Sequence, residues 1–341
     1  MMPAPSDDRA SAMAAQESAA QSRSKPWLNV LKVVVSAGLL VLVITQADLR
    51  AVWHLVAGAQ MGALAAAFVV VQLGVVLRAG RWMALMRGQG DHTPYGTLLY
   101  LYYVGAFFNT FLPTGFGGDA IRIYELSQDG GTPRAAISTV VAERALGLLV
   151  QFAMALLLLP LAWRLIPQEV ALLLLVFVLG AFVGTALFMS RKLYAWMADH
   201  LPLVGRLLRH PKIVALYGSF HGYSPRSVRQ AAGISVLFNV TLILNQWLLA
   251  RALGIGLGVL EFAVFTPILS TLLLVPITIG GLGVREGGYV LLYGQAGIPQ
   301  DQALALSLLT YATTLASGLI GGVLYVVVGL RRMRGRPRNA G

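Results

Sequence analysis

The sequence predicts an all-α polytopic membrane protein built from two inverted repeats, each made of a span, a re-entrant hairpin and a second span. Hydrophobic residues make up 57% of the 341 residues and charged residues only 12%, against about a quarter charged in soluble domains. Several apolar runs approach or exceed the roughly 20 residues that a helix needs to cross a bilayer. A ten-residue motif with a proline, two glycines and an arginine occurs twice within this apolar sequence.

Six segments are predicted to be full crossings. They are 28–45, 61–86, 137–160, 169–189, 229–253 and 302–330. Basic residues are densest in 191–229 and 331–338, and such clusters mark the cytoplasmic side of a membrane. Arg23, Lys25 and Lys32 place the N-terminus on the same side, which requires an even number of crossings. We therefore expect a multi-pass protein of the inner (cytoplasmic) membrane with both termini in the cytoplasm.

The chain is expected to hold a single transmembrane domain at 27–330, between a disordered cytoplasmic tail at 1–26 and a basic cytoplasmic tail at 331–341. The first repeat covers about 61–160 and the second about 224–330. The cytoplasmic segment 191–227 has an apolar pattern that fits short amphipathic helices on the membrane surface. It fits equally well an ordinary loop packed beneath the bundle.

Two stretches, 95–127 and 261–297, do not fit as plain spans. Each begins with an apolar half of about 15 to 18 residues, which is short for a full crossing, and then breaks at proline and glycine. Such backbone is tolerated at membrane depth only where protein buries it or where it lines a wet cavity. Both stretches are therefore predicted to be re-entrant hairpins or broken helices.

The repeated motif lies within these two hairpins. Its copies run from Pro113 through Gly117, Gly118 and Asp119 to Arg122, and from Pro276 through Gly280 and Gly281 to Arg285. The copies are 163 residues apart, and the same offset carries 61–86 onto 224–249 and 137–160 onto 300–323. Three crossings separate the hairpins, so the second repeat is inverted, as in secondary transporters. A chance match of two glycine pairs is the alternative.

The motif has the chemistry of an anion site. Proline ends one helix, glycines allow a turn, and the next helix begins with free N–H groups that attract phosphate or carboxylate. Asp119 is a candidate N-cap. We expect Arg122 and Arg285 to contact phosphate, with Glu143, Asp119 and Glu286 as counter-ions or proton carriers. The predicted substrate-binding residues are Arg78, Arg81, Asn109, Pro113, Gly117, Gly118, Asp119, Arg122, Glu143, Arg144, Pro276, Gly280, Gly281, Arg285 and Glu286.

Structural alternatives exist for several of these residues. Arg78 and Arg81 are spaced to share one helix face, and both could simply extend to the cytoplasmic surface. Glu143 and Arg144 could form salt bridges that stabilise the fold. Asn109 could bind a head group or satisfy carbonyls freed at the motif proline. Aromatic residues in 100–108 are expected to serve packing rather than a cofactor.

The composition excludes other classes of site. There is no cysteine, so disulfides and thiolate metal sites are absent. The five histidines are scattered without ligand spacing, and no metal or other cofactor is expected. No phosphate-binding loop of the ATPase type occurs. The net charge of +12 comes largely from basic residues at the ends of apolar segments. This placement reflects the orientation of the chain in the membrane, and no nucleic-acid partner is expected.

Three segments together resemble the lysylphosphatidylglycerol synthase transmembrane-region family. They are the Gly105–Arg122 run, Val141-Ala-Glu-Arg144, and the Gly-Gly-Leu-Gly-Val-Arg-Glu-Gly run within Pro276–Gly288. The resemblance covers about 28–330 and implies a flippase-like domain. In the bifunctional synthases this region is associated with moving aminoacylated lipid, which a separate soluble domain makes. Only eleven residues follow Leu330, so aminoacyl transfer is not expected here.

These observations predict a flippase or transporter that binds an anionic phospholipid head group between the two hairpins. Stand-alone relatives are linked to other lipids, including hopanoids and prenyl-linked intermediates, so the cargo stays open. Two further classes fit the same residues. One is a membrane-embedded transferase with Glu143 or Asp119 as base, and the other is a scaffold that recruits a lipid- or glycan-synthesis enzyme.

Overall fold

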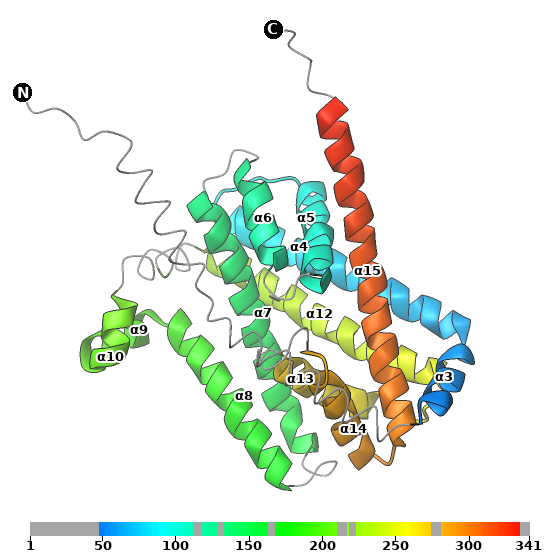
Figure 1. Cartoon of the computed structure of the whole chain (residues 1–341). Helices are drawn as coiled ribbons and strands as arrows, with labels where there is room; N and C mark the ends of the chain where they lie inside the picture. Colours follow the sequence, from blue (N-terminus) through cyan, green and yellow to red (C-terminus); the bar gives the residue numbers. More distant parts are fainter. Residues whose placement is uncertain are drawn as a thin grey trace, which may run out of the picture.

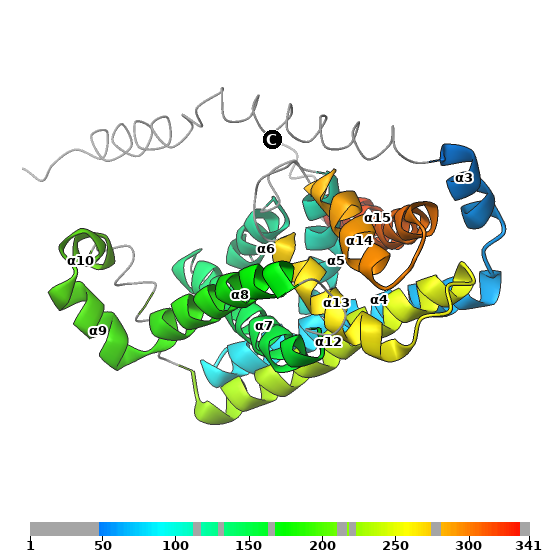
Figure 2. The same cartoon turned by 90° about the horizontal axis from the view of Figure 1, so that it is seen from below.

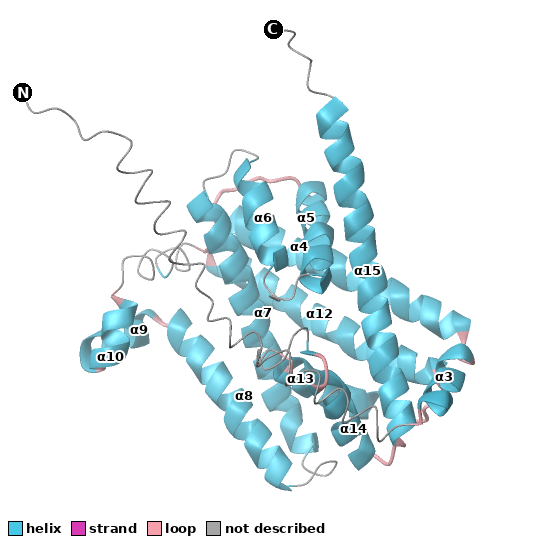
Figure 3. Ribbon diagram, viewed as in Figure 1, coloured by secondary structure: helices cyan, strands magenta, loops and turns pink. Residues whose placement is uncertain are grey.

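The computed structural model describes residues 48–111, 117–128, 133–162, 168–209, 217, 223–273 and 281–334. Throughout these ranges the regular secondary structure is helical, and no strand occurs in them (Figures 1 and 3). The prediction of an all-α polytopic membrane protein is confirmed, because several of these helices are long and apolar enough to cross a bilayer.

Four long helices form the body of the structure. They are α4 (Met61–Gly88), α7 (Pro133–Ala162), α12 (Pro225–Ala252) and α15 (Gln300–Arg334). Each contains 26 to 29 residues of membrane-spanning character, and at 1.5 Å per residue this is about 40 Å, more than the roughly 30 Å hydrocarbon core. These helices match four of the six predicted crossings.

The other two predicted crossings are described less completely. Helix α8 (Gln168–Met189) coincides with the crossing predicted at 169–189 and has an apolar sequence from Val170 to its end. The crossing predicted at 28–45 lies outside the described residues. The first described helix is α3 (Leu49–Ala57), which packs against α15 and has Asp48 as its N-cap.

Two pairs of short helices occupy the stretches predicted to be hairpins. The first pair is α5 (Tyr95–Phe111) with α6 (Gly117–Gln128), and the second is α13 (Val259–Leu272) with α14 (Val284–Gln295). At 1.5 Å per residue these helices are about 18 to 26 Å long, too short to cross the hydrocarbon core alone. Their connections, with Pro113, Pro276 and Gly280, lie outside the described residues.

Helices α4 and α12 lie side by side and run antiparallel along their whole length (Figure 2). Contacts between them progress in opposite directions along the two chains. At one end the Gln60 N–H donates to the Ala252 carbonyl (2.9 Å), further along Asn245 Nδ2 donates to the Ala67 carbonyl (3.0 Å), and at the far end Gly88 lies against Ser227. Gly74 lets the helices approach closely at the middle, where a side chain would meet Phe238 and Thr241.

The order of helix lengths is the same in both halves: long, short, short, long. The first half is α4–α7, and the second is α12–α15. Their packing is also reciprocal, because α5 of the first half packs on α15 of the second, and α13 of the second packs on α7 of the first. Within each half the first long helix packs on the first short one, and the second short helix packs on the second long one.

The segment predicted at 191–227 contains two short helices, α9 (Arg191–His200) and α10 (Pro202–Leu208), set apart from the helical body (Figure 1). The Tyr194 hydroxyl donates to the Leu208 carbonyl at 2.5 Å, which links the two helices. Trp196 is 51% exposed. The structure therefore has helices where the sequence allowed either helices or a loop, and their place on a membrane surface stays a prediction.

Candidate anion-binding site

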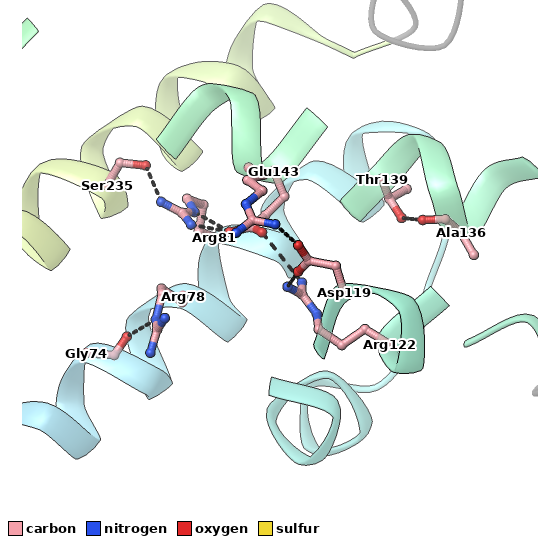
Figure 4. A network of polar contacts seen from close by, with 10 residues as sticks. Gly74, Arg78, Arg81, Asp119, Arg122, Ala136, Thr139, Glu143 and Ser235 are labelled. Atoms are coloured by element: carbon pink, nitrogen blue, oxygen red, sulfur yellow. Dashed lines mark hydrogen bonds and ion pairs between the residues drawn. The ribbon is translucent and has the colours of Figure 1, made fainter. Parts of the chain in front are cut away.

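A charged cavity lies where α4, α5, α6, α7 and α12 meet, and we call it the arginine cavity. It has a volume of about 160 Å³. Its charged lining residues are Arg78, Arg81, Asp119, Arg122, Glu143 and Arg144 (Figure 4). Among the described residues that line it, four arginines face two carboxylates, so the lining carries a net charge of +2.

Glu143 of α7 lies at the centre of this charge cluster. Its Oε1 accepts a hydrogen bond of 2.7 Å from Arg81 Nε, and its Oε2 lies 3.5 Å from Arg122 Nη2. Arg81 Nη1 also donates to Ser235 Oγ of α12 at 3.2 Å. Arg81 is only 6% exposed, so the alternative that it extends to the membrane surface is wrong. The salt bridges of Glu143 join helices and do not involve Arg144.

Arg122 of α6 is clamped between two aromatic rings. Its guanidinium carbon lies 4.1 Å from the centre of the Trp82 ring and 4.0 Å from that of Tyr102. Such stacking holds a cation while leaving its edge free to donate. The Nε atom is buried and has no hydrogen-bond acceptor within the described part of the chain, while Nη2 has only the ion pair with Glu143 at 3.5 Å. Tyr102 was expected to serve packing only, but it also holds Arg122 in the site.

Asp119 links the hairpin to α7. Its carboxylate forms a salt bridge with Arg144 Nη1 and lies 3.4 Å from Arg122 Nη1. The predicted N-cap role of Asp119 is wrong, because the residue lies inside α6, two positions after Gly117, and its side chain is committed to these arginines.

Asn109 of α5 takes the place of a capping residue for α6. Its Oδ1 accepts the Gly118 N–H at 2.8 Å, so this oxygen satisfies a donor at a helix start. A side chain at Gly118 would overlap the Gly105 carbonyl oxygen, and glycine is needed there for α5 and α6 to approach. One of the expected free N–H groups of the motif is therefore already occupied.

Arg78 differs from the other arginines of the cavity. Its Nε donates to the Gly74 carbonyl at 3.4 Å, and its guanidinium lies over the rings of Phe238 (5.0 Å) and Tyr102 (5.5 Å). Among the described residues no carboxylate lies within 4.0 Å of it. Within the part of the chain that the structure describes, the direct contacts of Arg78 are thus with neutral groups, although it is half-buried within a span.

A second cavity of about 310 Å³ adjoins the first, and we call it the hydroxyl cavity. The two cavities share Arg78, Ala106, Asn109 and Phe238. A closed set of hydrogen bonds lines the second cavity: Gln246 Nε2 donates to the Tyr289 hydroxyl, and Thr310 Oγ1 lies 3.2 Å from both Gln246 Oε1 and that hydroxyl. These three residues come from α12, α14 and α15.

Arg285 of the second motif copy lines the hydroxyl cavity. Arg285 Nη2 forms a salt bridge of 2.6 Å with Glu286 Oε1, and its guanidinium lies 4.3 Å from the centre of the Tyr311 ring. Glu286 Oε2 accepts the Gly283 N–H at 2.7 Å and so caps α14. Gly281 has a φ of +75°, a value that favours glycine. Arg122 and Arg285 therefore line neighbouring cavities, which share Arg78 and Asn109.

Sequence reasoning missed several lining residues. Ser235, Phe238, Gln246, Tyr289 and Thr310 were not among the candidates, although all of them line a cavity or bond to a residue that does. A usable signal existed in α12, where Asn239, Asn245 and Gln246 interrupt an apolar span. Polar groups within spans usually face a bundle interior or a cavity.

Comparison with known proteins identifies the family of the chain. A relative from Methanothermobacter thermautotrophicus, described as a UPF0104 membrane protein, is 23% identical over 294 residues, which are 77% of this chain and 83% of the relative. The family model described as the lysylphosphatidylglycerol synthase TM region matches residues 29–322. Because this match covers most of the 341 residues, the chain belongs to the lysylphosphatidylglycerol synthase TM region family.

Proposed function

We propose that this protein is a flippase-like lipid transporter that binds the phosphate of an anionic phospholipid between its two hairpins. One observation carries the proposal: Arg78 lines both cavities within a membrane span, and no described carboxylate pairs with it. An ionisable side chain at the membrane centre costs roughly 2.5–3.5 kcal/mol on insertion scales. A bound phosphate would offset this cost.

The neighbours of Arg78 support a phosphate ligand. The described lining of the arginine cavity has a net charge of +2, and the buried Nε–H group of Arg122 has no acceptor among the described residues. Guanidinium groups match phosphate oxygens through paired hydrogen bonds. Glu143 and Asp119 are both engaged by arginines, so we assign them the role of counter-ions that hold the arginines in place.

The arrangement of the two halves supports a transport role. The corresponding helices α4 and α12 run antiparallel. The short helices α5 and α13 each pack on a long helix of the other half. This is the packing expected of inverted repeats, which in secondary transporters hold the substrate between broken helices. The family description concerns a lipid-related membrane region. We further propose that the protein lies in the inner membrane with both termini in the cytoplasm.

The decisive experiment replaces Arg78 and uses Arg87 as its matched control. Both residues belong to α4, and Arg87 is exposed and lines neither cavity. Loss of a charged hydrogen bond costs about 1.5–3 kcal/mol, so Arg78→Gln should weaken anionic lipid binding about 10- to 150-fold. Arg87→Gln should leave it unchanged.

Binding is measured by native mass spectrometry of the purified protein, and transport by movement of labelled phospholipid across proteoliposomes. A folded Arg78→Gln protein that keeps the wild-type preference for anionic over zwitterionic lipid would overturn the phosphate assignment. Normal lipid binding together with no movement of lipid in the wild type would overturn the transport assignment.

A further inference from the structure

The hydroxyl cavity differs in chemistry from the arginine cavity that it adjoins. Eleven of its 21 described lining residues carry an uncharged hydroxyl or amide group, while only Arg78 and Arg285 are charged. Arg285 is already balanced by Glu286 at 2.6 Å. The second cavity therefore offers many hydrogen-bonding groups but no second free positive charge of its own.

Negative charge is also absent from the described lining of the hydroxyl cavity. The connecting segments 112–116 and 274–280 contain no aspartate or glutamate in the sequence. In the arginine cavity the two lining carboxylates are both paired with arginines. A cationic group that entered from the side of Arg78 would thus meet arginine and find no free counter-ion among the described residues.

The residues that the two cavities share place a charged site beside an uncharged one. Arg78 and Asn109 line both cavities, so a phosphate bound at Arg78 has the hydroxyl cavity directly beside it. The volume of about 310 Å³ lies at the lower end of the roughly 300–1,000 Å³ that ligand pockets occupy. The hydroxyl hydrogens of Tyr289 and Thr310 are already donated within the protein, but the oxygens of both residues can accept from the hydroxyl groups of a ligand, and Gln246 Nε2 keeps a second N–H to donate.

We infer that the lipid handled by this protein carries an uncharged, hydroxyl-bearing head group of the glycerol or sugar type, joined through its phosphate, and not a cationic aminoacylated one. This inference rests on the proposed phosphate site at Arg78 and adds the class of the head group. The phosphate occupies the arginine cavity, and the hydroxylated group occupies the hydroxyl cavity.

Four lipids with identical acyl chains test the inference by competition on the wild-type protein, followed by native mass spectrometry. They are phosphatidylglycerol, phosphatidic acid, lysylphosphatidylglycerol and phosphatidylcholine. Phosphatidylglycerol should bind best, ahead of phosphatidic acid by about two- to tenfold for each head-group hydroxyl that the cavity hydrogen-bonds. Phosphatidic acid has the larger negative charge, so attraction to arginine alone would reverse this order.

A matched pair of variants on α15 locates the contact. Thr310 lines the hydroxyl cavity and Thr313 does not, yet each hydroxyl donates to a carbonyl of its own helix, at 2.8 and 2.9 Å. Thr310→Val should lower the preference for phosphatidylglycerol over phosphatidic acid about two- to tenfold. Thr313→Val should leave the preference as in the wild type.

The outcomes separate this inference from the proposed function. Binding of lysylphosphatidylglycerol or phosphatidic acid at least as tight as phosphatidylglycerol overturns the head-group assignment and leaves the phosphate site standing. An unchanged preference in Thr310→Val also overturns it. Failure of every anionic lipid to bind better than phosphatidylcholine overturns the phosphate site itself.

Discussion

Replacing Glu143 with glutamine should destabilise the fold strongly, because the carboxylate neutralises two arginines at the centre of the bundle. The side chains of Glu143 and Arg81 are 3% and 7% exposed, so water cannot compensate for the lost charge. Removing one partner of a buried ion pair costs about 3–5 kcal/mol, mainly because the other charge stays buried and unpaired. The amide has nearly the same shape, so packing contributes little to the loss.

A double variant separates the charge from the packing. Arg81→Met combined with Glu143→Leu removes both charges of this pair and keeps apolar volume, and such replacements are often close to neutral. Arg122, which loses Glu143, keeps its ion pair with Asp119 at 3.4 Å. The double variant should therefore be more stable than Glu143→Gln alone, although it carries more substitutions. Ser235, which loses the Arg81 donor, keeps its bond to the Ala231 carbonyl at 2.8 Å.

Unfolding by sodium dodecyl sulfate in mixed micelles, followed by tryptophan fluorescence, measures these differences in free energy. Asp199→Asn is the control, because Asp199 and Arg209 form an ion pair at 3.1 Å with side chains 67% and 63% exposed. Its cost should stay below about 1 kcal/mol. A Glu143→Gln protein within about 1 kcal/mol of the wild type would refute the assignment of a buried, essential counter-ion.

Two further predictions concern the packing and the topology. Gly321→Ala should prevent α5 and α15 from packing, because the added Cβ would overlap the Tyr103 carbonyl oxygen. Gly233→Ala is the control, because its Cβ meets open space and should be tolerated. The yield of monodisperse protein after purification measures both effects. Single cysteines can be introduced without background because the chain has none. Ser127→Cys should react with an impermeant maleimide from the cytoplasm and Gln295→Cys from outside, and labelling of both from one side contradicts the inverted repeats.

The spans were predictable because their signal is local. A continuous apolar run of sufficient length has few alternatives to a membrane helix. The ends of α4, α7, α12 and α15 lie within about four residues of their predicted ranges. The two short-helix pairs were equally visible, since proline and paired glycines interrupt an apolar sequence there. The length of an apolar run and its interruption by proline or glycine can be read without knowing which helices pack together.

The pairing of charges was not predictable in the same way. Arg81 and Glu143 are 62 residues apart and meet only because α4 and α7 pack together. The exchange of roles between Asp119 and Asn109 has the same origin. Aspartate is the better N-cap on local preference, but Arg144 of a neighbouring helix binds it, and Asn109 of α5 accepts the N–H group at the start of α6 instead.

The two halves differ in the charges that they carry at equivalent positions. The offset of 163 residues relates Arg122 to Arg285, and both guanidinium groups stack on aromatic rings beside a cavity. The same offset relates Arg81, Asp119 and Glu143 to leucines. These three charges therefore occur in one half only, where a phosphate would bind.

The second half contributes one described arginine, Arg285, to the lining of a cavity, and Glu286, which follows it directly, pairs with it. A transporter with two identical halves would offer an anion the same site from either side of the membrane. Here an anion that leaves the arginine cavity meets neutral hydroxyl and amide groups. In the transporter proposed above, the phosphate would be held at one place, beside Arg78. Arg78 lines both cavities and, among their described charged residues, is the one that has no oppositely charged group within 4.0 Å.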